Sequence, residues 1–373
     1  MGKSNGTRGD APAPPPLPAD ASEIDGAWLD AALHAGGCAT EATIVDAVTE
    51  PVDGGVGIMG EITRFRLTWS DPDADVPATV IAKTPSALPE NRALGLMLGF
   101  YESEHRLYSE LCTDLGLRTP RCWFSGGDAE QGRYALIIED VGAYERIDQL
   151  DGADVAHAER VVDALASMHA KWWGAPELRK LPWLAAGYGD AIKIYGDIMA
   201  AAWPAFATAT EAATNEADRA LTERFIACFN DVVDEVADDP WTLVHRDFRV
   251  DNMMFDGGTP IVFDWASPAI GGGFYDFAYF VGGSLAIETQ EQTWTHLVEC
   301  YVEGLRSRGI EVPTGDALHR ALVYGALYCL IVPVMTVGDT LDVRDDRGLR
   351  LVHANLERVF TMLHALDAGA VLA

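Results

Sequence analysis

Positive charge is scarce in this 373-residue sequence, which has 27 Lys and Arg against 57 Asp and Glu and a formal net charge of −30. Such an acidic chain is repelled by nucleic-acid backbones and anionic bilayers, so we expect no nucleic-acid partner and no binding to a membrane surface. The surplus of acid either attracts a cationic substrate or only keeps the protein soluble, and we favour the second interpretation.

The sequence also lacks the cysteine and histidine spacings that build metal centres. Its six cysteines include no CxxC pair, and its nine histidines include no HExxH motif. These absences argue against a zinc site or a disulfide framework. We therefore expect buried free thiols in a reducing cytoplasm. No apolar stretch follows Lys3 and Arg8, so we expect no signal peptide.

Long hydrophobic runs are rare as well. The one long uncharged run is ALVYGALYCLIVPVMTVG, residues 321–338. A transmembrane helix needs about 20 apolar residues, and Pro333 interrupts this run. We predict a buried helix of a globular domain.

The pattern along the chain changes twice. Residues 1–20 include APAPPPLP and predict a disordered, extended tail. Residues 21–140 contain β-branched or alternating segments that predict strands (EATIVDAVTEPV, EITRFRLTW, ATVIAK, YALIIEDVG). Between the last two, NRALGLMLGFYESEHRLYSELCTDLG predicts one helix that stops near Gly116.

From residue 141 to residue 373 the pattern is mainly helical, interrupted by short strands around LVHRDF, NMMF and PIVFDW. We therefore predict an α+β fold of two lobes, joined by a linker near 139–143. The small lobe, 21–140, is rich in strands and carries one key helix, and the larger lobe, 141–373, is mainly helical. The length of the chain suits two domains.

A glycine-rich loop, DGGVGIMG at 53–60, connects two predicted strands. A dinucleotide-binding loop would lead into a helix, so that kind of site is disfavoured. Glycines still let backbone N–H groups approach phosphates closely, and the candidates are Gly54, Gly55 and Gly57. An ordinary flexible hairpin has the same composition.

Lys83, one of only five lysines, ends the strand ATVIAK and is either solvated or functional. The following helix favours a function, because Glu104 falls between the turns of its apolar stripe. An inward carboxylate is costly unless it is paired, and Lys83 is the obvious cation. The stripe consists of Met97, Phe100, Tyr101, Leu107, Tyr108 and Leu111.

The stretch LVHRDFRVDN, residues 243–252, crowds charged side chains behind an apolar start. Asp247 and Asn252 are five residues apart, and a DGGT turn would pair NMMF with PIVF, which brings Asp264 of IVFDW close to both. Phosphoryl transfer needs one carboxylate for the proton of the attacking hydroxyl, and an Asn and an Asp for magnesium. Each residue alone could instead cap the backbone of a polar loop.

Together, VIAK, the inward Glu104, IIEDVG, HRDFRVDN and IVFDW resemble the protein-kinase-like fold. More narrowly, they are similar to the aminoglycoside phosphotransferase and choline kinase superfamily. LASMHAKWW at 165–173 and FYDFAYF around Asp276 resemble segments of its ecdysteroid-kinase-like branch. The similarity spans about residues 40–340.

The resemblance implies that the cofactors are ATP and Mg²⁺. Asp247 would be the catalytic base, with Asn252 and Asp264 as magnesium ligands. Lys83, held by Glu104, would contact the α- and β-phosphates.

The adenine would meet the backbone of Glu139, Asp140 and Val141. We also expect His245 to brace the catalytic loop and Arg249 to reach the γ-phosphate or the substrate. Asp251 is expected to be a solvated bystander.

The expected partner is a small-molecule hydroxyl acceptor. DWA replaces DFG, only eleven residues separate Asp264 from Asp276, and no APE follows, so a protein kinase is disfavoured. We favour an apolar, steroid-like alcohol slightly over an aminoglycoside or an amino alcohol. A non-catalytic nucleotide-binding protein and a lipid kinase that uses the 321–338 run are the alternatives. Four tryptophans line such a pocket or fill the core: Trp172, Trp173, Trp183 and Trp203.

Overall fold

The computed structural model describes residues 13–38, 40–52, 60–237, 239–337 and 346–372. The chain divides into two compact units. Unit 1 comprises residues 1–114 and 119–143, and unit 2 comprises residues 115–118 and 144–373. Each unit is described by itself.

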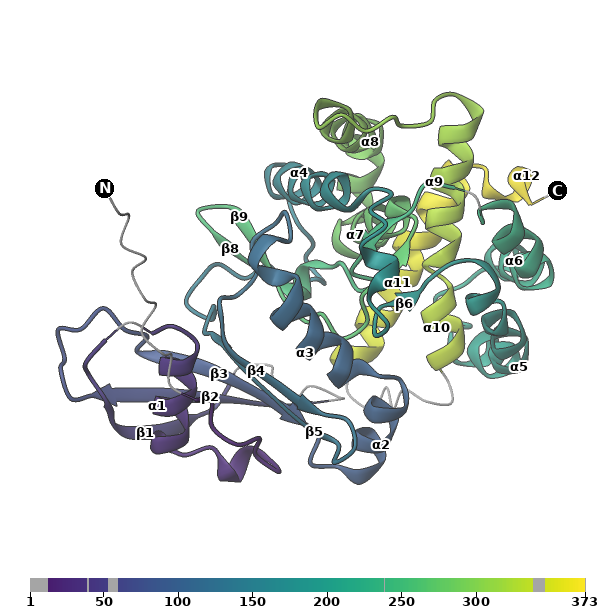
Figure 1. Cartoon of the computed structure of the whole chain (residues 1–373). Coiled ribbons are helices and arrows are strands. Elements are labelled where there is room, and N and C mark those ends of the chain that lie inside the picture. The colour runs from purple at the N-terminus through teal and green to yellow at the C-terminus, as the bar shows by residue number, and fades with distance from the viewer. Residues whose placement is uncertain (1–12, 39, 53–59, 238, 338–345, 373) are drawn as a thin grey trace. The chain divides into compact units, whose positions relative to one another are not determined.

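Unit 1 is built on a five-stranded antiparallel sheet with the order β1-β2-β3-β5-β4 (Figure 1). Its strands are β1 (Ile44–Glu50), β2 (Gly60–Trp69), β3 (Thr79–Pro85), β4 (Cys122–Asp128) and β5 (Arg133–Glu139). Four of these correspond to predicted strands. The sequence does not predict β4, because CWFSGGD contains two glycines and only a short apolar run.

Helix α1 (Gly26–Ala35) covers one face of this sheet and is not predicted above. Asp25 caps it, since its carboxylate accepts the Trp28 N–H at 2.8 Å. Leu17 packs against the core beneath α1, and Trp28 Nε1 donates to the Pro16 carbonyl at 2.7 Å. The chain is therefore packed from before residue 20, which differs from the expected disordered tail.

The one helix predicted before Gly116 is two helices, α2 (Pro89–Met97) and α3 (Phe100–Glu110). Gly99, at φ +70°, separates them, and glycine reaches this left-handed region without steric cost. Leu107 is buried on α3 as predicted, but the placement of Met97 on the apolar stripe is wrong. Met97 ends α2 and is 75% exposed.

Unit 2 is mainly helical, as predicted, with α7 buried along nearly its whole length. Gly325 of α9 lets that helix approach α7, because a Cβ there would lie 2.5 Å from the Phe274 carbonyl oxygen. The helices are α4 (Val155–Trp172), α5 (Ile194–Ala209), α6 (Glu216–Glu235), α7 (Gly273–Ser284), α8 (Ile287–Ser307), α9 (Asp316–Tyr328), α10 (Ile331–Thr336), α11 (Asp346–Ala365) and α12 (Ala368–Val371). Short 3₁₀ helices occur in the two units at Ala21–Glu23, Cys112–Asp114, Leu178–Lys180, Gly189–Ile192 and Val250–Asn252.

Two small sheets lie in unit 2. In the first, β10 (Ala269–Gly271) runs between β6 (Ala185–Ala186) and β7 (Thr242–Val244). The second is the predicted hairpin of β8 (Met253–Asp256) and β9 (Thr259–Val262), which is confirmed. Its turn contains Gly257 and Gly258 at φ +54° and +85°, values that glycine adopts readily.

The apolar stretch Asp316–Thr336 is long and apolar enough to cross a membrane by length and composition alone. In the structure it forms α9 and α10 rather than one helix, and 56% of its 18-residue apolar window is buried. The prediction of a buried helix over 321–338 is therefore correct only in part, since the helix is interrupted after Tyr328 and Val332 is 38% exposed. Residue 338 lies outside the described residues.

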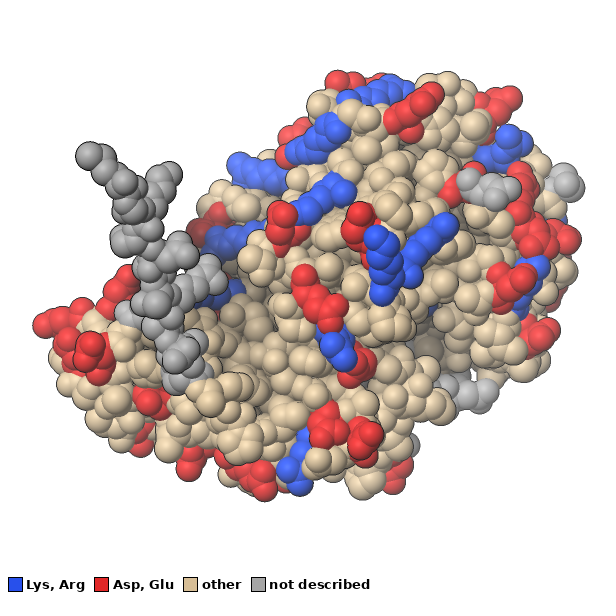
Figure 2. All heavy atoms as spheres, in the orientation of Figure 1, with Lys and Arg blue, Asp and Glu red and all other residues tan. Residues whose placement is uncertain are grey.

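Surface charge and the state of the cysteines are the remaining features of the fold. On the face drawn in Figure 2, Lys and Arg side chains are interspersed among the more numerous Asp and Glu. All six cysteines are free, but only Cys38 and Cys329 are buried, so the expectation of buried thiols is wrong for the other four. The predicted α+β architecture, a sheet-based unit and a mainly helical unit, is confirmed.

Candidate active site

In unit 1, the predicted ion pair between Lys83 and Glu104 is present, with 2.5 Å between Nζ and Oε1. Val80 and Ala82 of β3 belong to the core beneath α1, so the alternation of the strand directs Lys83 to the other face. There Glu104 of α3 is only 7% exposed. The cation offsets the cost of burying this carboxylate, and the pair fixes the position of the ammonium group.

At the end of β5 lie Glu139 and Asp140, whose backbone is expected to meet the adenine, and their side chains are engaged within unit 1. Glu139 Oε2 accepts the Arg121 N–H at 3.0 Å, and the Asp140 carboxylate binds the Arg64 guanidinium at 2.7 and 3.1 Å. Burial favours a raised pKa for Asp140, but hydrogen bonds from Arg64 and a backbone N–H lower the pKa below its ordinary value. Among the described residues, no backbone–backbone hydrogen bond outside the helices and strands involves Asp140 or Val141. The three loop glycines expected to contact phosphate lie outside the described residues: Gly54, Gly55 and Gly57.

In unit 2, the chain leaves β7 and turns sharply at Arg246, whose φ of +71° is seldom adopted by a non-glycine residue. Asp276 of α7, fully buried, holds this turn by accepting the N–H groups of His245 and Arg246 at 2.6 and 2.9 Å. His169 Nε2 lies 3.5 Å from the same carboxylate, and its Nδ1 is hydrogen-bonded to the Tyr301 hydroxyl at 2.6 Å. A buried carboxylate thus stabilises a backbone turn that costs about 1–3 kcal/mol of strain.

His245 is placed as a support of the loop. It is fully buried, its Nε2 is hydrogen-bonded to the Phe263 carbonyl at 3.0 Å, and its Nδ1 accepts the Asp247 N–H at 3.2 Å. Its ring packs on Trp265, with 4.3 Å between centroids. Since His245 has no exposed surface, it braces the loop as expected rather than touching a substrate.

The Asp247 carboxylate receives three side-chain donors. Arg249 Nε and the Tyr279 hydroxyl donate to Oδ1, each at 2.9 Å, and Asn252 Nδ2 donates to Oδ2 at 2.7 Å. Burial, and then the charge of Asp247, raise the pKa of Tyr279 well above its ordinary value, so its hydroxyl stays a donor. Among the described residues Oδ2 has one side-chain donor, and it keeps a lone pair through which it can accept a proton.

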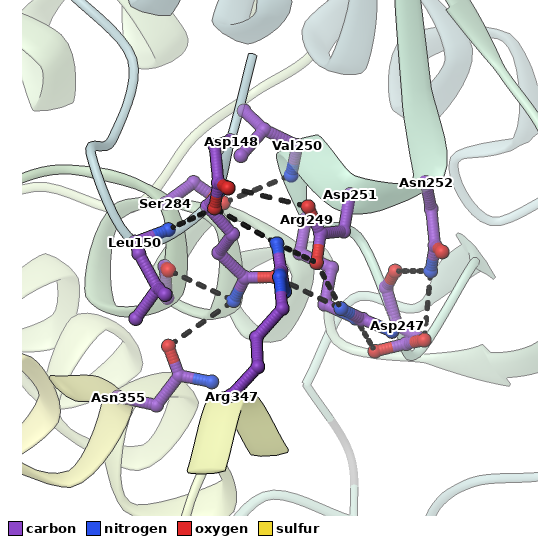
Figure 3. Close-up of polar contacts among 12 residues, drawn as sticks. Asp148, Leu150, Asp247, Arg249, Val250, Asp251, Asn252, Ser284, Arg347 and Asn355 are labelled. Atoms are coloured by element: carbon purple, nitrogen blue, oxygen red, sulfur yellow. Dashed lines mark hydrogen bonds and ion pairs between the residues drawn. The ribbon is translucent and has the colours of Figure 1, made fainter. Parts of the chain in front are cut away.

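Arg249 is held on its other side by residues that the sequence did not indicate. Its NH1 donates to Gln149 Oε1 at 2.8 Å and lies 3.5 Å from Asp251 Oδ2. Burial alone would lower the pKa of Arg249, but the charges of Asp247 and Asp251 raise it above its ordinary value. Gln149 is fully buried and donates in turn to Asn355 Oδ1 at 3.1 Å (Figure 3). Helix α11 therefore supports Arg249 indirectly, through Gln149.

The prediction that Asp251 is a solvated bystander is wrong. Its side chain is 12% exposed and lies 3.9 Å from Arg146. It also lies 3.8 Å from Arg347, which Figure 3 shows. It also accepts the Gln149 N–H at 3.4 Å. Arg358 of α11, whose pKa burial lowers, donates to the Gln149 carbonyl at 2.8 Å. All these partners are distant in sequence, so the local pattern around Asp251 could not indicate them.

Asn252 and Asp264 lie at the same end of the β8–β9 hairpin. Asn252 directly precedes β8, and the Phe263 N–H donates to the Asn252 carbonyl at 3.1 Å, which places Asp264 one residue further on. The Asn252 amide nitrogen is bound to the carbonyl and carboxylate of Asp247, so its Oδ1 is directed away from that residue. Asp264 has a left-handed backbone, φ +63°. One amide and one carboxylate oxygen fit Mg²⁺, which takes few protein ligands and completes its shell with water and phosphate oxygens.

A pocket of about 630 Å³ lies within unit 2 beside this loop. Val244, Arg246 and Tyr275 form part of its wall, and most of the other lining residues are aromatic or aliphatic. Of the four tryptophans singled out in the sequence, Trp173 lines it, together with Trp241, which was not singled out. The remaining three, Trp172, Trp183 and Trp203, are not among the described residues of its wall.

Comparison with family models gives one match, over residues 98–312, to the family described as the phosphotransferase enzyme family. This match covers more than half of the chain. No curated protein matches the chain.

Solved structures that share the fold include the following three. A protein of Ralstonia eutropha JMP134 assigned as an aminoglycoside phosphotransferase is 15% identical, with 86% of this chain and 92% of that chain covered and a TM-score of 0.54. The GDP and kanamycin complex of APH(2″)-IIIa is 14% identical, with 88% and 94% covered and a TM-score of 0.51. Choline kinase from Cryptosporidium parvum Iowa II is 8% identical, with 87% and 91% covered and a TM-score of 0.53. The predicted superfamily resemblance is confirmed at this level, while the ecdysteroid-kinase-like branch stays a prediction.

Proposed function

This chain belongs to the phosphotransferase enzyme family, and from that membership we propose that it transfers the γ-phosphoryl group of ATP to a hydroxyl group of a small molecule. One observation carries the proposal. The Asp247 carboxylate is fixed by three donors next to the hairpin end that carries Asn252 and Asp264. A base and a pair of oxygen ligands are the parts that phosphoryl transfer needs from a protein.

Asp247 acts as the base in this proposal. The acceptor hydroxyl passes its proton to Oδ2, its oxygen forms a bond to the γ-phosphorus, and the bond from that phosphorus to the β–γ bridging oxygen breaks to release ADP. Arg249 keeps the carboxylate oriented through Oδ1, and its fixed guanidinium is suited to bind a phosphoryl oxygen. The short loop thus both positions the base and supplies positive charge.

The remaining residues bind the nucleotide. Asn252 and Asp264 would hold Mg²⁺, which would neutralise charge on the phosphates. Lys83, kept in place by Glu104, binds the α- and β-phosphates. The main chain of Glu139, Asp140 and Val141 meets the adenine. The GDP complex of APH(2″)-IIIa supports the use of a nucleotide by this fold.

The acceptor that we propose is an apolar alcohol bound in the pocket of unit 2. The support is the composition of its wall, which is mostly aromatic and aliphatic. A polycationic amino sugar would need several carboxylates, and the described wall has two, Asp239 and Glu311, both exposed.

The test is the isosteric variant Asp247→Asn, assayed for ADP formation with and without acceptor. Loss of a general base is expected to lower kcat about 10²–10⁴-fold, while magnesium–nucleotide binding, measured by calorimetry, stays near that of the wild type. The matched control Asp190→Asn changes a carboxylate whose side chain is 92% exposed, and should leave both readouts unchanged.

Two results would contradict the proposal. One is an Asp247→Asn variant with wild-type turnover. The other is a wild-type protein that binds nucleotide yet phosphorylates no apolar alcohol, amino alcohol or amino sugar, which would favour a non-catalytic nucleotide-binding protein.

A further inference from the structure

The wall of the pocket in unit 2 is suited to a flat apolar molecule. At about 630 Å³ the pocket has the size of ordinary small-molecule sites. Eight aromatic residues contribute to its described wall: Trp173, Tyr188, Tyr195, Trp241, Phe274, Tyr275, Tyr324 and Tyr328. Rings of this kind bury large areas and favour offset or edge-to-face packing with a ligand ring.

Arg246 places a positive charge in this apolar wall. Its backbone is fully used, because the N–H donates to Asp276 and the carbonyl accepts the Tyr275 hydroxyl at 3.2 Å. Its side chain, which is partly buried, makes no hydrogen bond or ion pair with any described residue. In a chain with 57 acidic and 27 basic residues, other arginines pair readily, as Arg118 does with Asp256. A partly desolvated guanidinium without an anion is costly, so this one is suited to an anionic group of a ligand.

A second polar atom of the wall is also unsatisfied. The Tyr328 hydroxyl is buried and has no hydrogen-bond partner among the described residues. Its ring lies 6.5 Å from that of Tyr275, centroid to centroid. An unmade hydrogen bond of this kind costs about 1–3 kcal/mol, which a ligand oxygen would recover.

The same wall is poorly suited to a cationic ligand. An amine is usually held by the open faces of aromatic rings. Here the Arg179 guanidinium lies over the rings of Tyr188 and Trp241, 5.7 and 4.3 Å from their centroids. The two carboxylates of the wall, Asp239 and Glu311, are both exposed and therefore screened by water. Arg179 and Arg246 thus make the surroundings of these rings positively charged, which disfavours a cationic ligand.

The position of Arg246 relates this charge to the proposed chemistry. Arg246 directly precedes Asp247 in the chain, and Tyr275 of the wall lies 5.6 Å from Tyr279, whose hydroxyl binds the Asp247 carboxylate. A ligand group at Arg246 is therefore at the end of the pocket nearest the base. An acceptor hydroxyl would lie at the same end.

We propose that the pocket binds an apolar hydroxy acid, whose hydrocarbon body packs on the aromatic wall and whose carboxylate is held by Arg246. This proposal names the substrate class of the proposed phosphotransferase. It rests on the proposed function in one point: the hydroxyl next to the carboxylate is taken to be the phosphoryl acceptor. Binding itself requires neither nucleotide nor turnover.

Three matched probes test the charge preference of the wild-type protein by calorimetry without nucleotide. They are 3-phenyllactate, its methyl ester and phenylalaninol, which share ring and hydroxyl and carry a negative, a neutral and a positive group. We expect 3-phenyllactate to bind at least about 10-fold more tightly than the other two, the effect of one charge-assisted contact. Equal binding of the three probes, tighter binding of phenylalaninol, or no binding of 3-phenyllactate overturns the inference.

Two variants then locate the contact. Arg246→Gln should remove the preference for 3-phenyllactate over its ester, and Tyr328→Phe should weaken all probes a few-fold. The control Arg306→Gln makes the same change at an exposed arginine outside the wall and should keep the preference. If Arg246→Gln still prefers 3-phenyllactate over its ester, Arg246 does not hold the carboxylate. If that variant does not fold, the binding series with the wild-type protein still tests the charge preference.

Phosphorylation assays with the same probes keep this inference separate from the proposed function. Binding with the expected preference but no ADP formation contradicts the proposed function and leaves the hydroxy-acid site in place. ADP formation with the ester and phenylalaninol as readily as with 3-phenyllactate contradicts the inference and leaves the phosphotransferase in place.

Discussion

The two units hold their functional groups in different ways. In unit 1, Lys83 and Glu104 lie on a regular strand and a regular helix, and an ion pair joins them. In unit 2, Arg246 and Asp264 have left-handed backbones, and Asp247 is held by side chains of its own loop and of α7. A regular element directs a side chain by its own period, whereas an irregular loop needs partners from distant segments. Substitutions should therefore have local effects in unit 1 and far-reaching effects in unit 2.

The largest effect is expected from Asp276→Ala, which removes the anchor of the loop. It leaves the N–H groups of His245 and Arg246 without their acceptor, and each buried unsatisfied N–H costs about 1–3 kcal/mol. We expect the free energy of unfolding, measured in urea, to fall by about 3 kcal/mol, and kcat to fall by more than about 100-fold as the loop shifts. The control Asp316→Ala, at an exposed first turn of α9, should stay within about 0.5 kcal/mol. An unfolding curve that is unchanged by Asp276→Ala would show that Asp276 does not anchor the loop.

Next is Gln149→Leu, which tests whether α11 supports Arg249 through the glutamine. The substitution keeps the size of the side chain but removes the acceptor for Arg249 and the donor to Asn355. Since misplacement by about 1 Å can cost about 100-fold in rate, we expect kcat to fall about 10- to 100-fold with little change in the KM for ATP. Gln292→Leu, an exposed change of the same kind on α8, is the control. Equal losses in kcat and nucleotide affinity would show that the network is not specific to the loop.

Glu104→Gln tests the simpler arrangement of unit 1. The amide still accepts a hydrogen bond from Lys83 but no longer balances its charge. We expect the KM for ATP to rise about 10-fold, the equivalent of about 1.4 kcal/mol, with a smaller change in kcat. The exposed Glu130→Gln is its control. If Glu104→Gln lowers kcat as much as Gln149→Leu does, substitutions in unit 1 are not more local in effect than those in unit 2.

The smallest effect is expected from Asp140→Asn, read as a function of pH. The folded chain holds the pKa of Asp140 below its ordinary value near 3.8. The stability that this carboxylate contributes is therefore fully present above the unfolded pKa and is lost as the pH falls through the folded pKa. We expect the variant to lose about 0.5–1 kcal/mol at pH 7, and the difference from wild type to vanish in acid. A difference that persists in acid, or appears equally in the exposed control Asp75→Asn, would contradict the ion pair with Arg64.

The same contrast explains what could be predicted from the sequence. The Lys83–Glu104 pair and the β8–β9 hairpin follow from periods and turn residues within short segments, and both are present. Helix α1 also has a local signal, an Asp25 cap before an apolar run. The split at Gly99 shows how one glycine overrides an otherwise continuous helical pattern.

The support of Asp247 could not be predicted in the same way. Gln149 and Tyr279 reach the loop only because unit 2 folds segments far apart in sequence onto one another. For the same reason Asp251 was expected to be solvated, although its partners Arg146 and Arg347 lie in other segments. Tertiary packing, which no local pattern encodes, decides the environment of such residues.

The β8–β9 hairpin has a consequence for protein engineering. Its glycine turn lies at one end and the candidate magnesium ligands, Asn252 and Asp264, at the other. Successive strand residues point to opposite faces, so one residue inserted within β8 or β9 would shift the register and move a ligand away from its partner. Extra residues between Gly257 and Gly258 would leave the Met253–Val262 pairing intact, and lengthening a turn costs little loop entropy. The tip of this hairpin is therefore a suitable place to insert an affinity tag or a reporter peptide.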